Sequence, residues 1–163
     1  MDEPVYWLVL LGIFVAGASV RLLVRRPLLL GLSTALHPWE LVTAGASLVL
    51  LAFHCSAMFF AEWVNAVPSL SAPAASVREL GTASQTAYWV PVVMLVIATR
   101  RLWPPALGIL TFTLLGVGAT MFWPFELTTH YMWIGSAVIT IVVIASALVA
   151  RRDPPRAAIQ ESG

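Results

Sequence analysis

Apolar stretches alternate with short polar connections along the chain, and five of these stretches are predicted to be membrane-spanning helices. A helix needs about 20 predominantly apolar residues to cross the hydrocarbon core of a bilayer. Arginine, proline or a run of polar residues follows each stretch and marks where the helix should end. The predicted helices cover residues 5–20, 39–60, 80–99, 105–122 and 128–149, in one domain over residues 1–152.

Three further segments do not fit the pattern of a span. Residues 27–36 are apolar but too short to cross a bilayer, so we expect them to lie along the membrane interface or to extend the second helix backwards. Residues 61–78 are rich in polar side chains and proline and are predicted to be a connection. Residues 153–163 combine proline with small and polar residues, which predicts a disordered cytoplasmic tail.

Composition supports the membrane interpretation. Hydrophobic residues make up 60% of the 163 residues and charged residues only 10%, and the mean hydropathy is +0.88. Soluble domains are about 45–50% apolar and about 25% charged. The formal net charge of +1 gives no reason to expect nucleic acid as a partner. These values predict an all-α polytopic integral membrane protein whose main partner is the lipid bilayer.

The arginines predict how the chain is threaded. All nine basic residues are arginine, and five spans place eight of them on one side of the membrane, with only Arg78 on the other. The positive-inside rule then puts the N-terminus outside and the C-terminus in the cytoplasm. Arginine without lysine, together with abundant alanine, leucine and proline, is typical of a GC-rich bacterial genome. We therefore expect a multi-pass protein of the bacterial inner (cytoplasmic) membrane, whose acidic N-terminus favours a retained first helix over a cleaved signal peptide.

Polar and aromatic residues gather at the predicted outer ends of the helices. His54, Met58 and Glu62 follow a four-residue spacing, which places them on one face of a helix. Ionisable residues at membrane depth usually face the interior of a bundle or a water-filled cavity. The sequence therefore predicts an outward-facing polar vestibule, and its lining is expected to comprise His54, Met58, Glu62, Gln85, Tyr88, Glu126 and His130.

A purely structural interpretation accounts for the same residues. Tryptophans at a membrane interface are ordinary anchors, and exposed glutamates need no function. A histidine inside a span can simply hydrogen-bond to a neighbouring helix, and His54 is the residue to which this applies. The tryptophans concerned are Trp63, Trp89, Trp123 and Trp133.

One candidate chemistry is the binding of copper. Histidine, cysteine and methionine are the ligands that suit Cu(I), and His54, Met58 and His130 are the predicted ligands, with Cys55 and Met121 nearby. Haem is the other cofactor considered, with His54 and His130 as axial ligands of a single group. The three histidines of the chain are fewer than the four that a two-haem membrane cytochrome uses.

A second candidate is an enzyme that acts on a lipid-soluble, isoprenoid-like molecule. Such chemistry needs an acid that protonates an alkene or epoxide, and aromatic faces that stabilise the resulting cation. Glu62 or Glu126 would be the acid. The side chains predicted to hold the substrate are Trp63, Gln85, Tyr88 and Trp89.

The interpretation we favour from the sequence is a small accessory or binding protein that belongs to a larger membrane complex and could take up a hydrophobic small molecule. The chain has short connections and lacks a nucleophile elbow, a Cys-x-x-Cys pair and a phosphate-binding glycine loop. Small residues suited to close helix packing occur at Gly12, Gly17, Gly116 and Gly118. The motifs identify no known family, and they leave open whether the protein is an enzyme.

Overall fold

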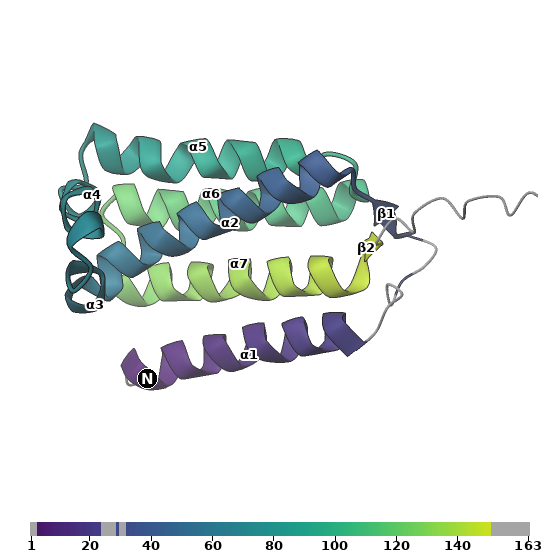
Figure 1. Ribbon diagram of the computed structural model, residues 1–163, viewed down its shortest axis with the longest axis horizontal. Helices are drawn as coiled ribbons and strands as arrows, with labels where there is room; N and C mark the ends of the chain where they lie inside the picture. Colours follow the sequence, from purple (N-terminus) through teal and green to yellow (C-terminus); the bar gives the residue numbers. More distant parts are fainter. Residues whose placement is uncertain (1–2, 24–28, 30–31, 151–163) are drawn as a thin grey trace, which may run out of the picture.

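The computed structural model describes residues 3–23, Leu29 and residues 32–150, and it shows a bundle of long helices lying side by side (Figure 1). The prediction of an all-α protein is confirmed, since the described strands contain two residues each. The elements are α1 (Glu3–Leu23), β1 (Thr34–Ala35), α2 (Pro38–Phe59), α3 (Ala61–Asn65), α4 (Pro68–Arg78), α5 (Thr82–Ala98), α6 (Pro104–Phe122), α7 (Leu127–Ala147) and β2 (Val149–Ala150).

Several of these helices have the length and composition of membrane spans. Helices α2, α6 and α7 each pass this criterion alone. Helices α4 and α5 pass it only together and meet at a bend of 100°, which gives a fourth candidate. Helix α1 contains a shorter apolar stretch, Val5–Ser19. The described residues thus contain three to four candidate spans, which mark the chain as a multi-pass membrane protein.

Proline sets the start of three helices, because its missing N–H has no partner in the first turn anyway. Pro38 opens α2, Pro68 opens α4 and Pro104 opens α6. Helix α5 starts at Thr82, two residues later than predicted, because Leu80 adopts a φ of 52° at the bend that follows α4.

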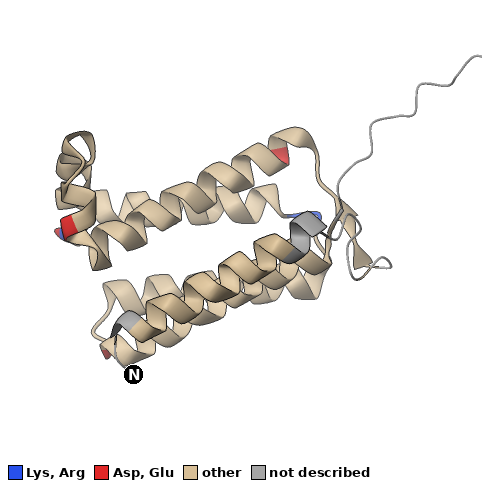
Figure 2. Cartoon of the chain, turned by 60° about the horizontal axis from the view of Figure 1, so that its bottom comes forward, with Lys and Arg blue, Asp and Glu red and all other residues tan. Residues whose placement is uncertain are grey.

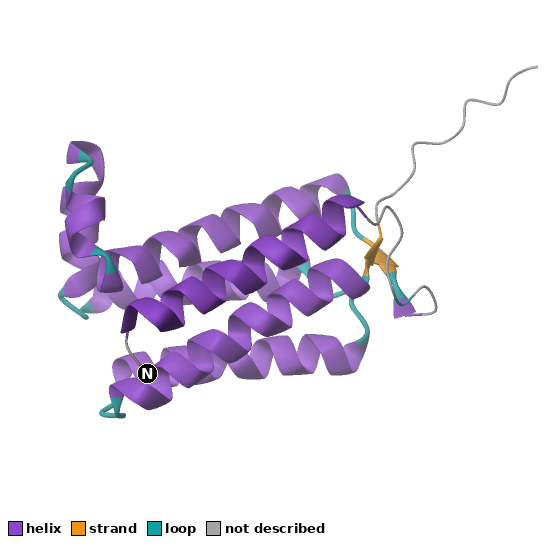
Figure 3. Cartoon of the chain, turned by 90° about the horizontal axis from the view of Figure 1, so that it is seen from below, coloured by secondary structure: helices purple, strands orange, loops and turns teal. Residues whose placement is uncertain are grey.

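Two connections differ from the prediction. Residues 61–78 form α3 and α4, which lie at one end of the bundle (Figures 1 and 3). At the opposite end, Thr34–Ala35 is extended and pairs in parallel with Val149–Ala150, so α2 does not extend back before Pro38. The Thr34 N–H donates to the Leu148 carbonyl (2.8 Å), a group that the end of α7 leaves without an intrahelical partner. Residues 27, 28, 30 and 31 and the predicted tail 153–163 lie outside the described residues.

The long helices pack in an order that differs from their order in the chain. Helix α2 packs along α5, α5 contacts α6, α6 packs along α7, and α7 packs along α1. Between the described parts of α1 and α2, the backbones make no extensive contact. The five helices therefore form an open arc with α1 and α2 at its two ends.

Glycines allow close contact inside this arc. A Cβ built on Gly116 would lie 2.1 Å from the ring of Trp133, one on Gly118 would lie 2.4 Å from Trp89, and one on Gly17 would lie 2.2 Å from Val142. Only glycine fits such positions, because real Cβ atoms essentially never approach so closely. Three of the small residues noted in the sequence therefore serve packing within the chain.

We expect Gly118→Ala to destabilise the bundle by about 1–3 kcal/mol, because the new methyl group would collide with the ring of Trp89. Gly108→Ala in the same helix is the matched control, since an added Cβ there meets nothing within 4 Å. That change should stabilise by about 0.5–1 kcal/mol through helix propensity. Unfolding in detergent, followed by circular dichroism, measures both, and equal effects would contradict the packing described here.

Candidate functional site

Charged side chains lie at the two ends of the bundle, and its middle carries none among the described residues (Figure 2). At one end, near α3 and α4, buried polar side chains form a layer just inside the bundle. At the other end, a buried carboxylate meets two arginines. An apolar cavity lies between these two polar regions. These three features are the candidate sites of the protein.

The buried polar layer joins α2, α5, α6 and α7. The His54 side chain is completely buried, and its Nε2 atom lies 3.0 Å from Met121 Sδ. The Tyr88 hydroxyl donates to the Leu114 carbonyl at 2.6 Å. Thr120, next to Met121 in α6, is 2.8 Å from Nδ1 of the buried His130. Both predicted histidines are thus brought to the same turn of α6.

The hydrogen bonds of this layer restrict the protonation of its imidazoles. A methionine sulfur carries no proton, so His54 Nε2 must be the donor if its contact with Met121 is a hydrogen bond. Nδ1 of His54 has no hydrogen-bond partner among the described residues. When the Thr120 hydroxyl donates to the Gly116 carbonyl (2.8 Å), it can only accept from His130 Nδ1. In this arrangement a proton is on Nε2 of His54 and on Nδ1 of His130.

Met58 and Glu62 do not join this layer. Met58 packs against a separate small cluster that contains Ala57, Val64, Ala74 and Val77. Glu62 lies on α3 and is exposed, because α2 ends at Phe59 and the backbone turns at Phe60 (φ −126°, ψ 44°). The prediction that His54, Met58 and Glu62 share one helix face is therefore wrong for Glu62, and Met121 is the methionine whose sulfur lies beside His54.

The remaining predicted site residues divide between the surface and the core. Gln85 and Glu126 are exposed. Trp63 and Trp123 are 77% and 60% exposed, as expected of interfacial anchors. Trp89 and Trp133 instead pack on Gly118 and Gly116. Of the seven predicted vestibule residues, only Tyr88 lines either of the two cavities described below.

The metal and haem hypotheses stay predictions. In residues 3–23, 29 and 32–150, no group of three or more histidine, cysteine, aspartate or glutamate side chains is close enough together to hold a metal ion. A metal-bound histidine usually donates its second ring nitrogen to a neighbouring acceptor. Nδ1 of His54 lacks such an acceptor within the described structure.

An apolar cavity of about 380 Å³ lies within the arc of helices, between α1 and α2. Its size falls within the range of about 300–1,000 Å³ that is common for small-molecule sites. All five long helices contribute to its wall, with Trp7 from α1, Cys55 from α2, Tyr88 from α5, Leu114 from α6 and Ala137 from α7 among the lining residues. None of its described lining residues is charged.

Aromatic rings lie at the Trp7 end of this cavity and bridge α1 and α2. The ring of Trp7 lies 5.1 Å from the rings of both Phe59 and Phe60 and 5.9 Å from that of Tyr131. The indole Nε1–H of Trp7 is buried and has no hydrogen-bond partner in the described part of the chain. A buried donor without a partner costs about 1–3 kcal/mol.

Sequence reasoning missed this cavity, and no local signal could have found it. Its walls are ordinary leucine, valine and alanine residues that any apolar helix contains. The cavity exists because α1 packs on α7 and α2 packs on α5, which only the tertiary arrangement shows.

Sequence reasoning also missed Glu40, which is completely buried in the first turn of α2. Its Oε1 atom lies 3.3 Å from Arg101 Nε and 3.9 Å from Arg100 Nη2, and its Oε2 atom accepts the His37 backbone N–H at 2.8 Å. Glutamate three residues after a helix N-cap often bonds back to the cap in this way. The pattern His37-Pro-Trp-Glu40 was therefore a usable signal.

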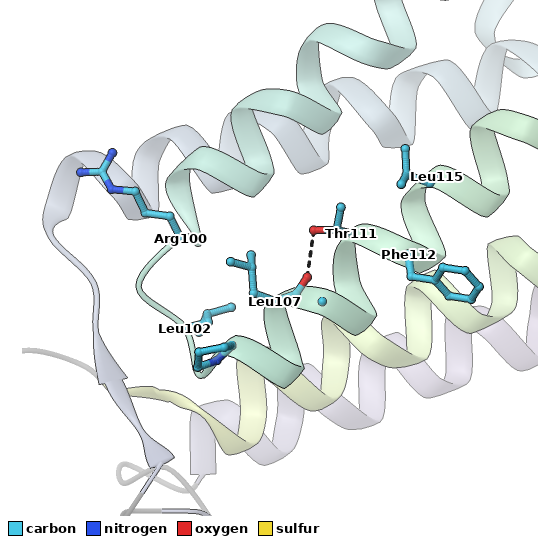
Figure 4. Close-up of a pocket in the computed structure, with 8 residues that line it drawn as sticks. Arg100, Leu102, Leu107, Thr111, Phe112 and Leu115 are labelled. Carbon is cyan, nitrogen blue, oxygen red and sulfur yellow. Dashed lines mark hydrogen bonds between the residues drawn. The ribbon is translucent and has the colours of Figure 1, made fainter.

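A second cavity, of about 450 Å³, follows one face of α6 beside this cluster (Figure 4). Thr111 is on that face, but its hydroxyl donates to the Leu107 carbonyl of its own helix at 2.8 Å. The surface of the groove is therefore apolar except at its Arg100 end. The side chains labelled in Figure 4 are Arg100, Leu102, Leu107, Thr111, Phe112 and Leu115.

Arg78, at the opposite end of the bundle, is satisfied locally. Its guanidinium reaches the Ala57 carbonyl near the end of α2 (3.5 Å) and Oδ1 of Asn65 (3.4 Å). A cation at the C-terminal end of a helix is favoured by the helix dipole. Arg78 therefore ties α4 to α2.

No protein-family model, curated protein or solved structure matches this chain. Its function must therefore be inferred from the residues and geometry described above.

We expect Glu40→Gln to destabilise the protein by about 1–3 kcal/mol, because the change removes the counter-ion of two arginines and leaves a buried amide with imperfect partners. Thermal unfolding in detergent is the measurement. Glu62→Gln is the control, because an exposed glutamate should change stability by no more than about 0.5 kcal/mol. Equal stability of the two variants would show that the Glu40 contacts hold nothing in place.

Proposed function

We propose that the chain crosses the inner membrane of a bacterium five times, through α1, α2, α5, α6 and α7, with its N-terminus outside and its C-terminus in the cytoplasm. The contacts at one end of the bundle support this threading. The Thr34 hydroxyl donates to the Arg101 carbonyl at 3.0 Å, and β1 pairs with β2. The connections after α1, after α5 and after α7 thus meet at one end. In the sequence, these connections carry seven of the nine arginines, and an eighth, Arg21, is in the last turn of α1.

Reporter fusions test the threading. A green fluorescent protein fused after Gly163 should be fluorescent, and alkaline phosphatase inserted between α3 and α4 should be active, because that enzyme matures only outside the cytoplasm. Active phosphatase after Gly163 would contradict the proposed topology.

Within this membrane domain, we propose that the protein is a small binding or accessory component that takes up a lipophilic molecule. The apolar cavity between α1 and α2 is the observation that carries the proposal. Its position at the open side of the arc gives an apolar molecule a route from the bilayer. Its lack of charged lining residues favours a neutral ligand with a long apolar part.

The carboxylates of Glu62 and Glu126 are exposed and do not line the cavity, so the proposed role does not depend on them as acids.

Binding of a neutral pyrene-labelled long-chain alcohol to the detergent-purified protein tests this function. Ala137→Phe places a bulky ring in the wall of the cavity and should weaken binding by about tenfold or more, which corresponds to about 1.4 kcal/mol. Trp7→Phe replaces the indole in the cavity wall by a smaller ring and should weaken binding by a smaller factor. Ala46→Phe, on the exposed face of α2 and away from both cavities, is the control and should bind normally. Unchanged binding by Ala137→Phe would overturn the proposal.

A further inference from the structure

A separate site lies on the outer face of α6, at the end of the bundle that carries the arginines. It is the groove of about 450 Å³ shown in Figure 4. Leu107, Gly108, Phe112 and Leu115 give it an apolar wall. Arg100 is the single charged residue among its described lining residues. Figure 4 shows the Arg100 side chain extending from this end of the groove towards the segment that precedes α2, so its charge lies beyond the apolar wall. An apolar groove with one cation beyond its end has the same division of chemistry as a phospholipid.

The charge at that end is only partly neutralised by the protein. Arg101 and Arg100 share the single carboxylate of Glu40, which leaves one positive charge in excess in this described cluster. Arg101 is the closer partner, at 3.3 Å against 3.9 Å for Arg100. The Arg100 side chain is 52% exposed and its guanidinium lies 5.5 Å from the ring centre of Trp39. Arg100 is therefore held in position while its charge remains accessible to an anion.

The apolar part of the groove has the length of one leaflet. Pro104 and Leu115 mark its ends on α6, and this separation corresponds to about 16 Å of helix at about 1.5 Å per residue. One leaflet occupies about half of a hydrocarbon core of about 30 Å. Gly108 makes room in the middle, since a Cβ built there would meet no atom within 4 Å.

We propose that this groove holds one anionic phospholipid, with its phosphate on Arg100 and an acyl chain along α6. Basic pockets between transmembrane helices on the cytoplasmic side are typical binding sites for anionic headgroups. A net negative headgroup complements the excess positive charge of the cluster, whereas a zwitterionic headgroup brings an ammonium group towards the arginines. The site is separate from the cavity between α1 and α2. The lipid proposed here therefore does not depend on the ligand proposed for that cavity.

Native mass spectrometry of the full-length protein tests the headgroup. The protein is exchanged into micelles that contain equal amounts of phosphatidylglycerol and phosphatidylcholine, and the retained lipids are counted. The wild type should retain one phosphatidylglycerol in preference. Arg100→Gln should reduce that preference about tenfold, while Arg101→Gln should reduce it by a smaller factor, because Arg101 does not line the groove but its loss leaves Arg100 alone with the Glu40 carboxylate. An equal loss of the preference for phosphatidylglycerol in both variants would contradict a site at Arg100 and indicate a general effect of charge.

A second pair of variants tests the acyl chain. Gly108→Phe places a ring in the groove, where the added Cβ meets nothing within 4 Å, and should abolish the selective retention. Gly45→Phe is the matched control, because Gly45 is also in a helix, meets nothing within 4 Å and lines neither cavity. Normal retention by Gly108→Phe would overturn the proposal. Inorganic phosphate should not displace the lipid at a concentration at which excess phosphatidylglycerol does, and equal displacement by both would show a bare phosphate site instead.

Discussion

The buried carboxylate of Glu40 fixes the N-terminal end of α2, and the rest of the arrangement depends on where α2 lies. Glu40 joins the first turn of α2 to the turn between α5 and α6. At the far end of α2, the guanidinium of Arg78 holds the Ala57 carbonyl. The first contact joins α2 to the turn after α5, the second joins α2 to α4, and between them α2 packs along α5. Apart from the aromatic rings near Phe59, the described parts of α1 and α2 make no extensive contact. The separation of α2 from α1 is what leaves the central cavity.

Hydroxyl side chains in the long helices mostly bond within their own helix. Ser47, Thr86, Thr111 and Ser136 each donate to the carbonyl four residues earlier. This pattern suits a bilayer, where no water is present to satisfy an exposed polar group. Few polar contacts therefore remain to hold one described helix to the next. Close packing of glycine against aromatic rings, as at Gly116 and Trp133, supplies much of the cohesion.

The sequence was sufficient to predict the long helices, because local signals mark where these helices begin and end. Pro38 and Pro104 open helices where the chain predicts, and the apolar runs between polar connections become α1, α2, α5, α6 and α7. The placement of His54 and His130 inside the bundle also follows from their position within apolar runs.

The sequence could not decide which side chains meet. Met58 is close to His54 along α2, but Met121 is its neighbour in space, because the packing of α6 beside α2 decides that contact. Glu62 does not lie on the face of α2 because that helix ends before Phe60, and Phe60 has no property that marks a helix end. No sequence pattern predicts the cavity. It forms where α1 and α2 do not pack against each other, and its walls consist of residue types that any apolar helix contains.

Helix α1 has a consequence for biosynthesis. Its extensive packing partner among the described elements is α7, and the hydroxyl of Tyr6 bonds to the carbonyl of Tyr131, 125 residues later in the chain. Translation proceeds at roughly 5–20 residues per second. On the proposed threading, α1 enters the membrane first and is surrounded by lipid for roughly ten seconds until α7 arrives. Its described side chains from Val5 to Ser19 carry no charge, so α1 can remain in the bilayer alone for that time.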